Sequence, residues 1–308
     1  MRALGIDTSN YTTSAAVFDG SGGYNAGRLL EVRPGELGLR QSDALFQHIK
    51  HLPGRFAELR AEGWLTGLSA VGASARPRAV EGSYMPCFLV GEGQGRTLAD
   101  ALGVPFYPVS HQQGHIAAAW SAGRLELLDR PMLAWHLSGG TTELLYVEPD
   151  GVNVRAQCVG GTSDISAGQL IDRTGVLLGL PFPAGKALDA LASESGPVRG
   201  FPVKLNDLTF SLSGMENKVK ALAEQGEPPA EIARFTLETV ASAVRRATDA
   251  ARKRWPGLPV LCSGGVASNR LLRTVMSDAA FAAPQYSTDN AMGAAILAWR
   301  SLRQEAEA

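Results

Sequence analysis

The chain has 308 residues, of which 45% are hydrophobic and 19% charged, a composition typical of a globular protein with a large core. Its formal net charge is −1, so no overall positive field attracts nucleic acid, and an RNA ligand would need a local basic patch or a partner protein. The three cysteines, Cys87, Cys158 and Cys262, lack paired spacing, so we expect no disulfides. No apolar run is long enough for a membrane span, and Asp7 comes too early for a signal peptide. We therefore expect a cytoplasmic protein without membrane contact.

The first half is predicted to begin with three strands and to continue with alternating helices and strands. Short apolar runs bounded by Gly, Asn and Asp indicate the strands, and apolar residues three or four positions apart indicate the helices. The predicted strands cover residues 2–6, 14–18, 28–32, 70–75 and 104–109, and the predicted helices cover residues 42–52 and 93–102.

The second half repeats this pattern. The predicted strands cover residues 132–137, 143–147, 152–159, 259–262 and 285–288, and the predicted helices cover residues 166–178, 230–255, 269–279 and 290–304. Two prolines precede the longest of these helices and a Pro-Gly pair follows it, as expected for helix ends.

An internal duplication explains both patterns. Each half begins with a three-strand meander, and the segment HQQGHIAAAW at 111–120 corresponds to NAMGAAILAW at 290–299. The expected fold is therefore α/β, with two mixed sheets flanked by helices on either side of a cleft, where ligands of such folds bind. One domain is predicted from residues 1–110 plus 290–308, and the other from residues 111–289.

His111 and His115 give the strongest local signal. The i, i+4 spacing places them on one face of a helix that begins directly after a strand, so both imidazoles can bind one metal ion. Asp289 precedes the corresponding helix of the second repeat and is expected to approach from the opposite side, which leaves coordination positions open for zinc or iron. Two surface histidines and a helix N-cap aspartate are the alternative interpretation.

Three turns of small residues are candidate sites for a nucleotide. Backbone N–H groups in such turns can approach phosphate oxygens closely, and a helix start adds a favourable dipole. The turn residues are Asp7 and Ser9 in the first, Ser138, Gly139, Gly140 and Thr141 in the second, and Gly264 and Gly265 in the third. Any one of them alone is an ordinary tight turn, but three at equivalent places favour a nucleotide.

Two further features are less specific. Asp172, on the predicted helix 166–178, is a candidate for binding ribose hydroxyls, with a salt bridge to Arg173 or Lys186 as the alternative. The basic stretch from Arg245 to Arg254 spreads over two helix faces, so a solvated surface is favoured and an RNA contact is the alternative.

Seven segments in chain order resemble the motifs of the catalytic subunit family of tRNA threonylcarbamoyladenosine synthase, also called the glycoprotease family. They are LGIDTS, VSHQQGHIAAAW, LSGGTTELLYV, AGQLIDRTGVLLGLPFPAG, FSLSG, SGGVASNR and STDNAMGAA, and together they cover nearly the whole chain. The resemblance implies the two-domain fold of actin, sugar kinases and Hsp70. It also implies transfer of a threonylcarbamoyl group from an adenylate to the adenosine beside the tRNA anticodon, with the help of accessory protein subunits.

The resemblance also implies the residues that bind the ligands. His111, His115 and Asp289 match the metal ligands of the family. The positions that match its adenylate contacts are residues 137–141, Asp172, Gly185 and Asn269.

The first turn departs from the family pattern. The family continues it with Cys, Asp and a second acid, whereas this chain has Asn10, Tyr11 and Thr12 there. Thr141 also replaces a histidine, and the loop at 76–86 is basic and bulky rather than glycine-rich. The chain is therefore interpreted as a divergent paralogue that keeps the metal and an adenine nucleotide or acyl-adenylate. No catalytic residue is assigned, because the one positional candidate for a base is Tyr11, and a tyrosine side chain, with an unperturbed pKa of about 10, is a poor base without help.

The leading hypothesis is a metal-assisted acyltransferase that modifies tRNA by moving a carbamoyl-type group, threonylcarbamoyl by resemblance, from an adenylate to an acceptor. The alternative is a catalytically inactive nucleotide-binding scaffold or partner subunit of the same family, which the lost acids favour. A phosphotransferase is disfavoured because Mg²⁺ prefers oxygen ligands, and a peptidase because HxxxH lacks the glutamate of HExxH.

Overall fold

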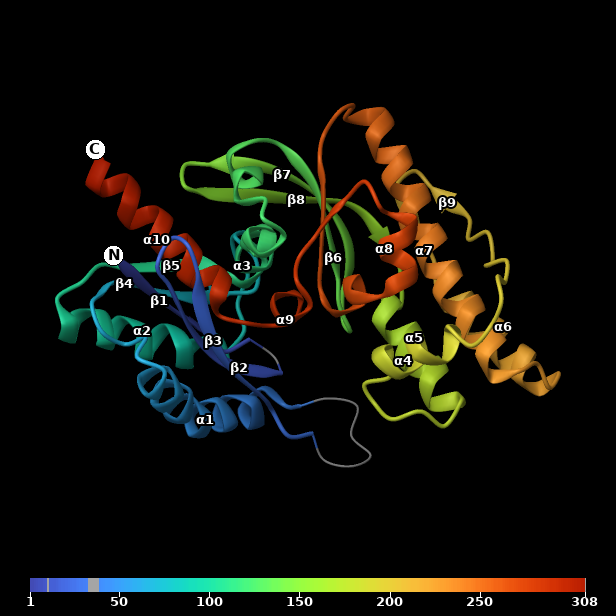
Figure 1. Ribbon diagram of the computed structural model, residues 1–308, viewed down its shortest axis with the longest axis horizontal. Helices are drawn as coiled ribbons and strands as arrows, with labels where there is room; N and C mark the ends of the chain where they lie inside the picture. Colours follow the sequence, from blue (N-terminus) through green and yellow to red (C-terminus); the bar gives the residue numbers. More distant parts are fainter. Residues whose placement is uncertain (10, 33–38, 308) are drawn as a thin grey trace. The chain divides into compact units, whose positions relative to one another are not determined.

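Two mixed β-sheets organise the chain (Figure 1). The computed structural model describes residues 1–9, 11–32 and 39–307. The chain divides into a first unit of Met1–Arg130, Glu148–Ala156 and Asp289–Ala308, and a second unit of Pro131–Val147 and Gln157–Thr288. This division differs from the predicted boundary at residue 110, because residues 111–130 lie with the first unit.

The first unit contains a five-stranded sheet with helices packed on it. Its strands are β1 (Arg2–Asp7), β2 (Thr12–Phe18), β3 (Gly23–Leu29), β4 (Leu68–Arg76) and β5 (Phe106–Ser110), in the order β3-β2-β1-β4-β5. Its helices are α1 (Gln41–Ala61), α2 (Phe88–Leu102), α3 (His111–Ala117) and α10 (Met292–Glu307), with short 3₁₀ turns η1 (Ala118–Ala122) and η2 (Leu125–Asp129). Strand β2 is buried along its whole length, which its small and β-branched residues allow.

The second unit holds most of a seven-stranded sheet, in the order β12-β11-β6-β7-β8-β10-β9. The strands are β6 (Met132–Leu137), β7 (Thr142–Asp150), β8 (Asn153–Thr162), β9 (Leu205–Asn206), β10 (Thr209–Phe210), β11 (Val260–Ser263) and β12 (Ala280–Phe281). The helices are α4 (Ala167–Leu177), α5 (Gly185–Ala192), α6 (Ser213–Glu224), α7 (Pro229–Arg254), α8 (Arg270–Val275) and α9 (Pro284–Ser287), with the 3₁₀ turn η3 (Gly265–Ser268). Across the described ranges, none of the helices has the length and apolar character needed to cross a bilayer.

The strand topology confirms the predicted duplication. The order β3-β2-β1-β4-β5 of the first sheet is repeated as β8-β7-β6-β11-β12 in the second. In both sheets the first strand pairs antiparallel with the second and parallel with the later strand on its other side, β4 or β11. Two repeats, each with a meander and two parallel strands, therefore account for the element order of most of the chain.

Glycines let α10 lie directly on the first sheet. A Cβ added at Gly5 in β1 would lie 2.3 Å from the carbonyl oxygen of Ala291 and 2.4 Å from the nitrogen of Ala295. A Cβ at Gly72 in the neighbouring strand β4 would lie 2.7 Å from the carbonyl oxygen of Ala294. Since real Cβ atoms do not approach backbone this closely, the two glycines set how near the helix comes to the sheet, and this fixes the start of α10.

Several predicted elements are wrong in type or extent, among them α1, which runs to Ala61 rather than to residue 52, and α2, which begins at Phe88 rather than at residue 93. The segment predicted as strand 285–288 is helix α9, because Pro284 stands at its first position, where the ring fixes a helical φ and no N–H is needed. The predicted strand 28–32 is displaced, since the hairpin pairs Gly23 with Phe18 and β3 ends at Leu29. The helix predicted over 269–279 ends at Val275.

Candidate functional site

The first turn of α3 is fixed by a capping box. Ser110, the last residue of β5, accepts a hydrogen bond on its hydroxyl from the Gln113 backbone N–H, 3.2 Å away. The side-chain oxygen of Gln113 accepts in return from the backbone N–H of Ser110, at 2.8 Å. The Gln113 amide then donates to the Val154 carbonyl at 2.8 Å. These bonds orient the helix that carries His111 and His115.

Helices α3 and α10 cross at two glycines, Gly114 and Gly293. A Cβ on Gly293 would lie 2.1 Å from the carbonyl oxygen of Gly114, so only glycine permits this approach. The two glycines occupy the same, fourth, position in the repeated segments 111–120 and 290–299. The duplication has therefore produced a close crossing of equivalent helices, and it brings Asp289, just before α10, to the histidines of α3.

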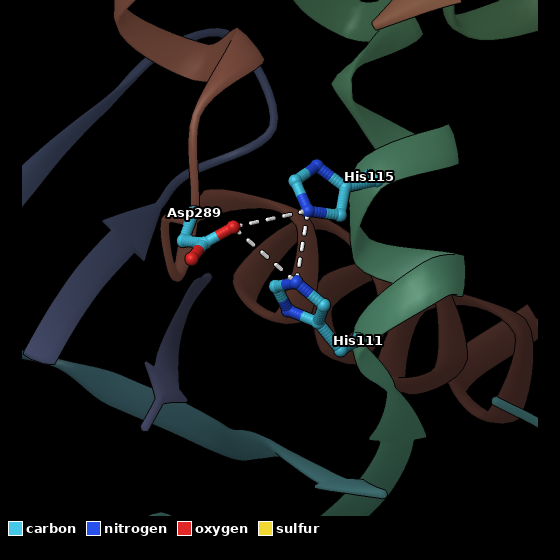
Figure 2. A group of neighbouring side chains, drawn as sticks. All are labelled: His111, His115 and Asp289. Carbon is cyan, nitrogen blue, oxygen red and sulfur yellow. Dashed lines mark hydrogen bonds and ion pairs between the residues drawn. The ribbon is translucent and has the colours of Figure 1, made fainter. Parts of the chain in front are cut away.

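His111, His115 and Asp289 converge as the sequence predicts (Figure 2). The Nε2 atoms of the two histidines lie 2.9 Å apart, and Oδ1 of Asp289 lies 3.5 Å from each of them. Ligand atoms bound to one zinc ion at about 2.0–2.1 Å lie about 2.9–3.4 Å from one another, depending on the bond angle. The donor types and their spacing therefore fit one transition-metal ion with further coordination positions open.

The N-terminal cap of α10 comes from Asn290. Its side-chain oxygen accepts from the N–H of Met292 at 3.0 Å, and Asn25 of β3 accepts from the N–H of Ala291 at 3.1 Å. The alternative interpretation of Asp289 as a simple helix cap is therefore not what the structure shows. Its carboxylate faces the two imidazoles instead.

Asp7 lies behind His111. Its Oδ2 is 2.9 Å from Nδ1 of His111 and also accepts from the Ser74 hydroxyl, while Oδ1 accepts from the backbone N–H and the hydroxyl of Ser9. Only 1% of Asp7 is exposed. A carboxylate at Nδ1 favours the tautomer in which that nitrogen carries the proton, so the Nε2 lone pair is left for a metal. The predicted contact of Asp7 and Ser9 with a nucleotide stays a prediction, and these bonds give both residues a positioning role.

The electrostatics of the cluster favour a bound cation. Burial lowers the pKa of His111, but the negative charges of Asp7 and Asp289 outweigh it and raise this pKa to about 10. Burial and the nearby charge of His111 lower the pKa of His115. Burial raises the pKa of Asp289, but hydrogen bonds to the two histidines outweigh it, so the pKa is lowered. The two carboxylates thus favour a positive charge at His111, as they would favour a cation bound there.

The turn from Ser138 to Thr141, in the second unit, leaves two N–H groups free. The Ser138 N–H donates to the Thr141 carbonyl at 2.8 Å, and the Thr141 N–H donates to the Ser138 hydroxyl at 3.1 Å. Gly139 and Gly140 donate no backbone hydrogen bond to any described residue, and a Cβ on either would meet no atom within 4 Å. Packing does not require glycine at these two positions, and their predicted contact with a nucleotide stays a prediction.

The turn at Gly264 and Gly265 has a different explanation. Gly264 has a φ of +98°, and a Cβ there would lie 2.2 Å from the carbonyl oxygen of Leu137. Packing of β11 beside β6 therefore accounts for Gly264 without a ligand. Gly265 has only a Thr288 methyl group 3.9 Å from its Cβ position, so it stays a candidate.

Asp172 and Asn269 both have partners within the second unit. Asp172 accepts from the Ala184 backbone N–H at 2.8 Å, and burial raises its pKa. Within the described residues it forms no salt bridge. Asn269 accepts from the N–H of Leu272 and donates to Asp189 at 2.7 Å, so it caps α8 and ties it to α5. These contacts explain both residues structurally, and their predicted binding to an adenylate stays a prediction.

Sequence reasoning missed Ser74 and Asp189. Ser74 becomes visible only through the parallel pairing of β1 and β4, which places it beside Asp7. Asp189 lies one helical turn after Gly185, the candidate at the start of α5, and it binds both Asn269 and Arg270. Neither residue belongs to a recognisable motif. Asn10, the first of the three residues in the first turn that differ from the family pattern, lies outside the described residues.

Comparison with known proteins adds a family to this geometry. The sequence model of the TsaD family, described as tRNA N6-adenosine threonylcarbamoyltransferase, matches residues 47–296. A relative of that name from a strain of Thermus thermophilus is 35% identical, over 97% of this chain and 93% of its own length.

Solved structures support the fold. Full-length HypF in its phosphate- and nucleotide-bound form matches 98% of this chain and 46% of its own, with a TM-score of 0.61 at 13% identity. A ROK hexokinase from Thermus thermophilus matches 98% of this chain and all of its own, with a TM-score of 0.50 at 19% identity. The expected duplicated fold of the actin, sugar-kinase and Hsp70 class is confirmed.

Proposed function

The chain belongs to the TsaD family of tRNA N6-adenosine threonylcarbamoyltransferases, and from this premise we propose that it transfers a threonylcarbamoyl group from an adenylate to an adenosine of tRNA. In this reaction the adenosine N6 forms a bond to the carbamoyl carbon, and the bond from that carbon to the phosphate oxygen breaks. The adenylate leaves as a nucleoside monophosphate, and N6 loses one proton. The observation that carries the proposal is the convergence of His111, His115 and Asp289 in a chain of this family.

The metal-binding residues are proposed to be His111, His115 and Asp289. A transition-metal ion bound there would supply a Lewis acid for an oxygen of the donor, and either iron or zinc suits the set. Asp7 holds His111 in the required tautomer, and Ser9 and Ser74 hold Asp7.

The adenylate is proposed to bind in the second unit. Support comes from the free N–H groups of Gly139 and Gly140, which can donate to phosphate oxygens, with Ser138 and Thr141 closing the turn. Gly265, Gly185, Asp172 and Asn269 are proposed to contact the rest of the nucleotide, by their match to the family motifs.

No residue is assigned as the base that removes the N6 proton. Thr12 is 8% exposed and begins β2, and Tyr11 accepts a backbone hydrogen bond from Leu30 at 2.8 Å. Neither replaces the carboxylates that the family has at these positions. The proton acceptor is therefore proposed to come from the substrate, from water or from an accessory subunit. We also propose that the chain works in the cytoplasm together with such subunits.

The proposal is tested by supplying the purified chain with threonylcarbamoyl-adenylate and an unmodified tRNA, then digesting the tRNA and measuring threonylcarbamoyladenosine by mass spectrometry. The matched variant is His115→Ala, and the control is His51→Ala, an α1 histidine outside the metal cluster. Product from wild type and His51→Ala, and none from His115→Ala, supports the proposal. Equal product from His115→Ala contradicts the role of the metal residues.

A second candidate function is an inactive scaffold that binds the nucleotide without transfer. The observation that favours it is the replacement of both acids of the first turn by Tyr11 and Thr12. The scaffold predicts no modified tRNA in the same assay, even with the family's accessory subunits from a relative added. A scaffold and an active transferase would both bind the nucleotide. Gly140→Trp, which fills the turn, is therefore expected to weaken nucleotide binding, measured by calorimetry, equally in both cases.

A further inference from the structure

A shallow cavity of about 210 Å³ opens on the second unit, and none of the residues that line it is named above as a ligand candidate. Phe201, Val203 and Met215 form its apolar part, and Lys204 and Lys218 supply two cationic side chains. The segment that carries Phe201 is held on α7, because the Phe201 N–H donates to the Thr239 hydroxyl at 2.9 Å. The cavity thus has an apolar surface that a hydrogen bond attaches to α7, with two lysines beside it.

Lys218 contacts an aromatic ring that lines this cavity. Its Nζ lies 4.3 Å from the centre of the Phe201 ring, which is a cation–π contact. The contact restrains a side chain that is otherwise highly mobile, while leaving the ammonium hydrogens that point away from the ring available to a ligand. An ordered ammonium group loses less conformational entropy on binding an anion than a free one.

The cations around the cavity lack acidic partners. Lys204 and Lys218 form no ion pair with any described residue, and neither does Arg246, whose guanidinium donates to the Val203 carbonyl. Neighbouring cations differ. Lys220 pairs with Glu216 at 2.9 Å, and Arg254 pairs with Asp207. Three unneutralised positive charges therefore gather at one place on a chain whose formal net charge is −1.

The carboxylate bonded to Ser211, a residue that lines this cavity, is already saturated. Asp164 accepts hydrogen bonds from the hydroxyls of Ser211 and Ser213 and from the N–H groups of Leu212 and Ser213. It occupies the N-terminus of α6, so an anion is excluded there by repulsion. An anionic ligand is directed to the lysine side of the cavity.

We propose that Lys204, Lys218 and Arg246 bind the phosphodiester backbone of the tRNA, with a ribose lying on the apolar surface of Phe201 and Val203. This inference rests on the proposed function, because the proposed function identifies tRNA as the substrate. The chemistry fits because lysine and arginine contacts to phosphates supply most of the affinity of proteins for nucleic acid. The volume holds a ribose and a phosphate, which suits a backbone contact that positions the tRNA without reading its bases.

The test compares the double variant Lys204→Ala/Lys218→Ala with Lys220→Ala, a matched control two residues away on α6 whose charge is already paired. Binding of unmodified tRNA is measured by fluorescence anisotropy at several salt concentrations. We expect the double variant to bind about 10-fold more weakly at low salt, with the slope of log affinity against log salt reduced by about 1–2, and the control to change less than about twofold.

Wild-type affinity and salt slope in the double variant would overturn this site while leaving the proposed function intact. A wild-type protein without measurable affinity for tRNA, alone or with accessory subunits, would contradict both the site and the proposed function. Circular dichroism of each variant checks the fold, and because Lys204 and Lys218 are exposed, we expect it unchanged.

Discussion

The cluster of His111, His115 and Asp289 in the first unit and the glycine turns of the second are built in opposite ways. In the cluster, titratable side chains from β1, α3 and the segment just before α10 converge, and hydrogen bonds and ion pairs connect them. In the turn from Ser138 to Thr141, the atoms offered to a ligand are backbone N–H groups, and two positions carry no side chain at all. The chemical types of the side chains thus indicate which kind of ligand the cluster can bind, whereas the backbone N–H groups of a turn can bind many different ligands.

The same comparison separates glycines that packing requires from glycines that it does not require. Gly264 and Gly293 are required because a Cβ would enter another backbone segment, at 2.2 Å and 2.1 Å. Gly139 and Gly140 meet nothing within 4 Å. Substitutions at the two kinds of position should therefore separate stability from ligand binding.

The largest effect is expected from Asp289→Asn. The change keeps the size of the side chain but removes the charge that faces both histidines, so metal affinity should fall by more than about 100-fold. Competition with a fluorescent chelator measures it. Asp129→Asn, at an exposed carboxylate that binds Arg300 in the same unit, is the control and should bind metal as wild type does.

A smaller loss is expected from Asp7→Asn, which leaves the three ligands in place. The amide is a weaker acceptor and no longer favours the Nδ1–H tautomer of His111, so metal affinity should fall by about 10–100-fold. The same competition assay measures this change. An unchanged affinity would show that Ser9, Ser74 and Asp7 serve the fold only.

Gly264→Ala tests packing in the second unit. The positive φ and the contact with Leu137 should lower the free energy of unfolding by about 2 kcal/mol or more. Gly140→Ala should leave stability within about 0.5 kcal/mol of wild type and weaken adenylate binding instead. Chemical denaturation and calorimetry measure the two quantities. Equal destabilisation by both variants would refute the distinction between these glycines.

The smallest effect concerns His48, a buried histidine of α1 that bonds to the Thr13 hydroxyl at 2.8 Å. Burial lowers its pKa to about 4, against the attraction of Asp7 and Asp289. Because the folded-state pKa lies below the unfolded value of about 6.5, its contribution to stability is present above pH 6.5 and is lost as pH falls towards 4. His48→Asn keeps the bond to Thr13 without titrating. Between pH 7 and 5, wild type should therefore lose roughly 3 °C more in Tm than the variant.

The sequence predicted the side-chain cluster because helical spacing and duplication are local signals. His111 and His115 are one turn apart, and Asp289 precedes the matching helix of the other repeat. The meanders and the long helix α7 followed from apolar periodicity in the same way. What the sequence did not predict depends on contacts between segments far apart in the chain: the Asp7 carboxylate turned towards His111, Ser74 beside it, and the crossing at Gly114 and Gly293.

Errors occurred where short segments lacked periodicity. Helix α9 has four residues, and its proline outweighs the β-propensity of the segment that follows it. Helices α5 and α6 were not predicted, since the Gly and Ser residues at their starts read as loop. For the turns of the second unit, sequence and structure agree on the backbone. Neither identifies the ligand, because backbone N–H groups carry no chemical preference among anions.

The most direct test of the central claim is metal analysis of the purified, untagged chain beside His115→Ala, by plasma mass spectrometry without chelators in any buffer. We expect about one iron or zinc ion per wild-type chain, and little or none in His115→Ala at unchanged secondary structure. Equal metal content in the two proteins, or none in the wild type even after incubation with iron and zinc, would contradict a metal centre at His111, His115 and Asp289.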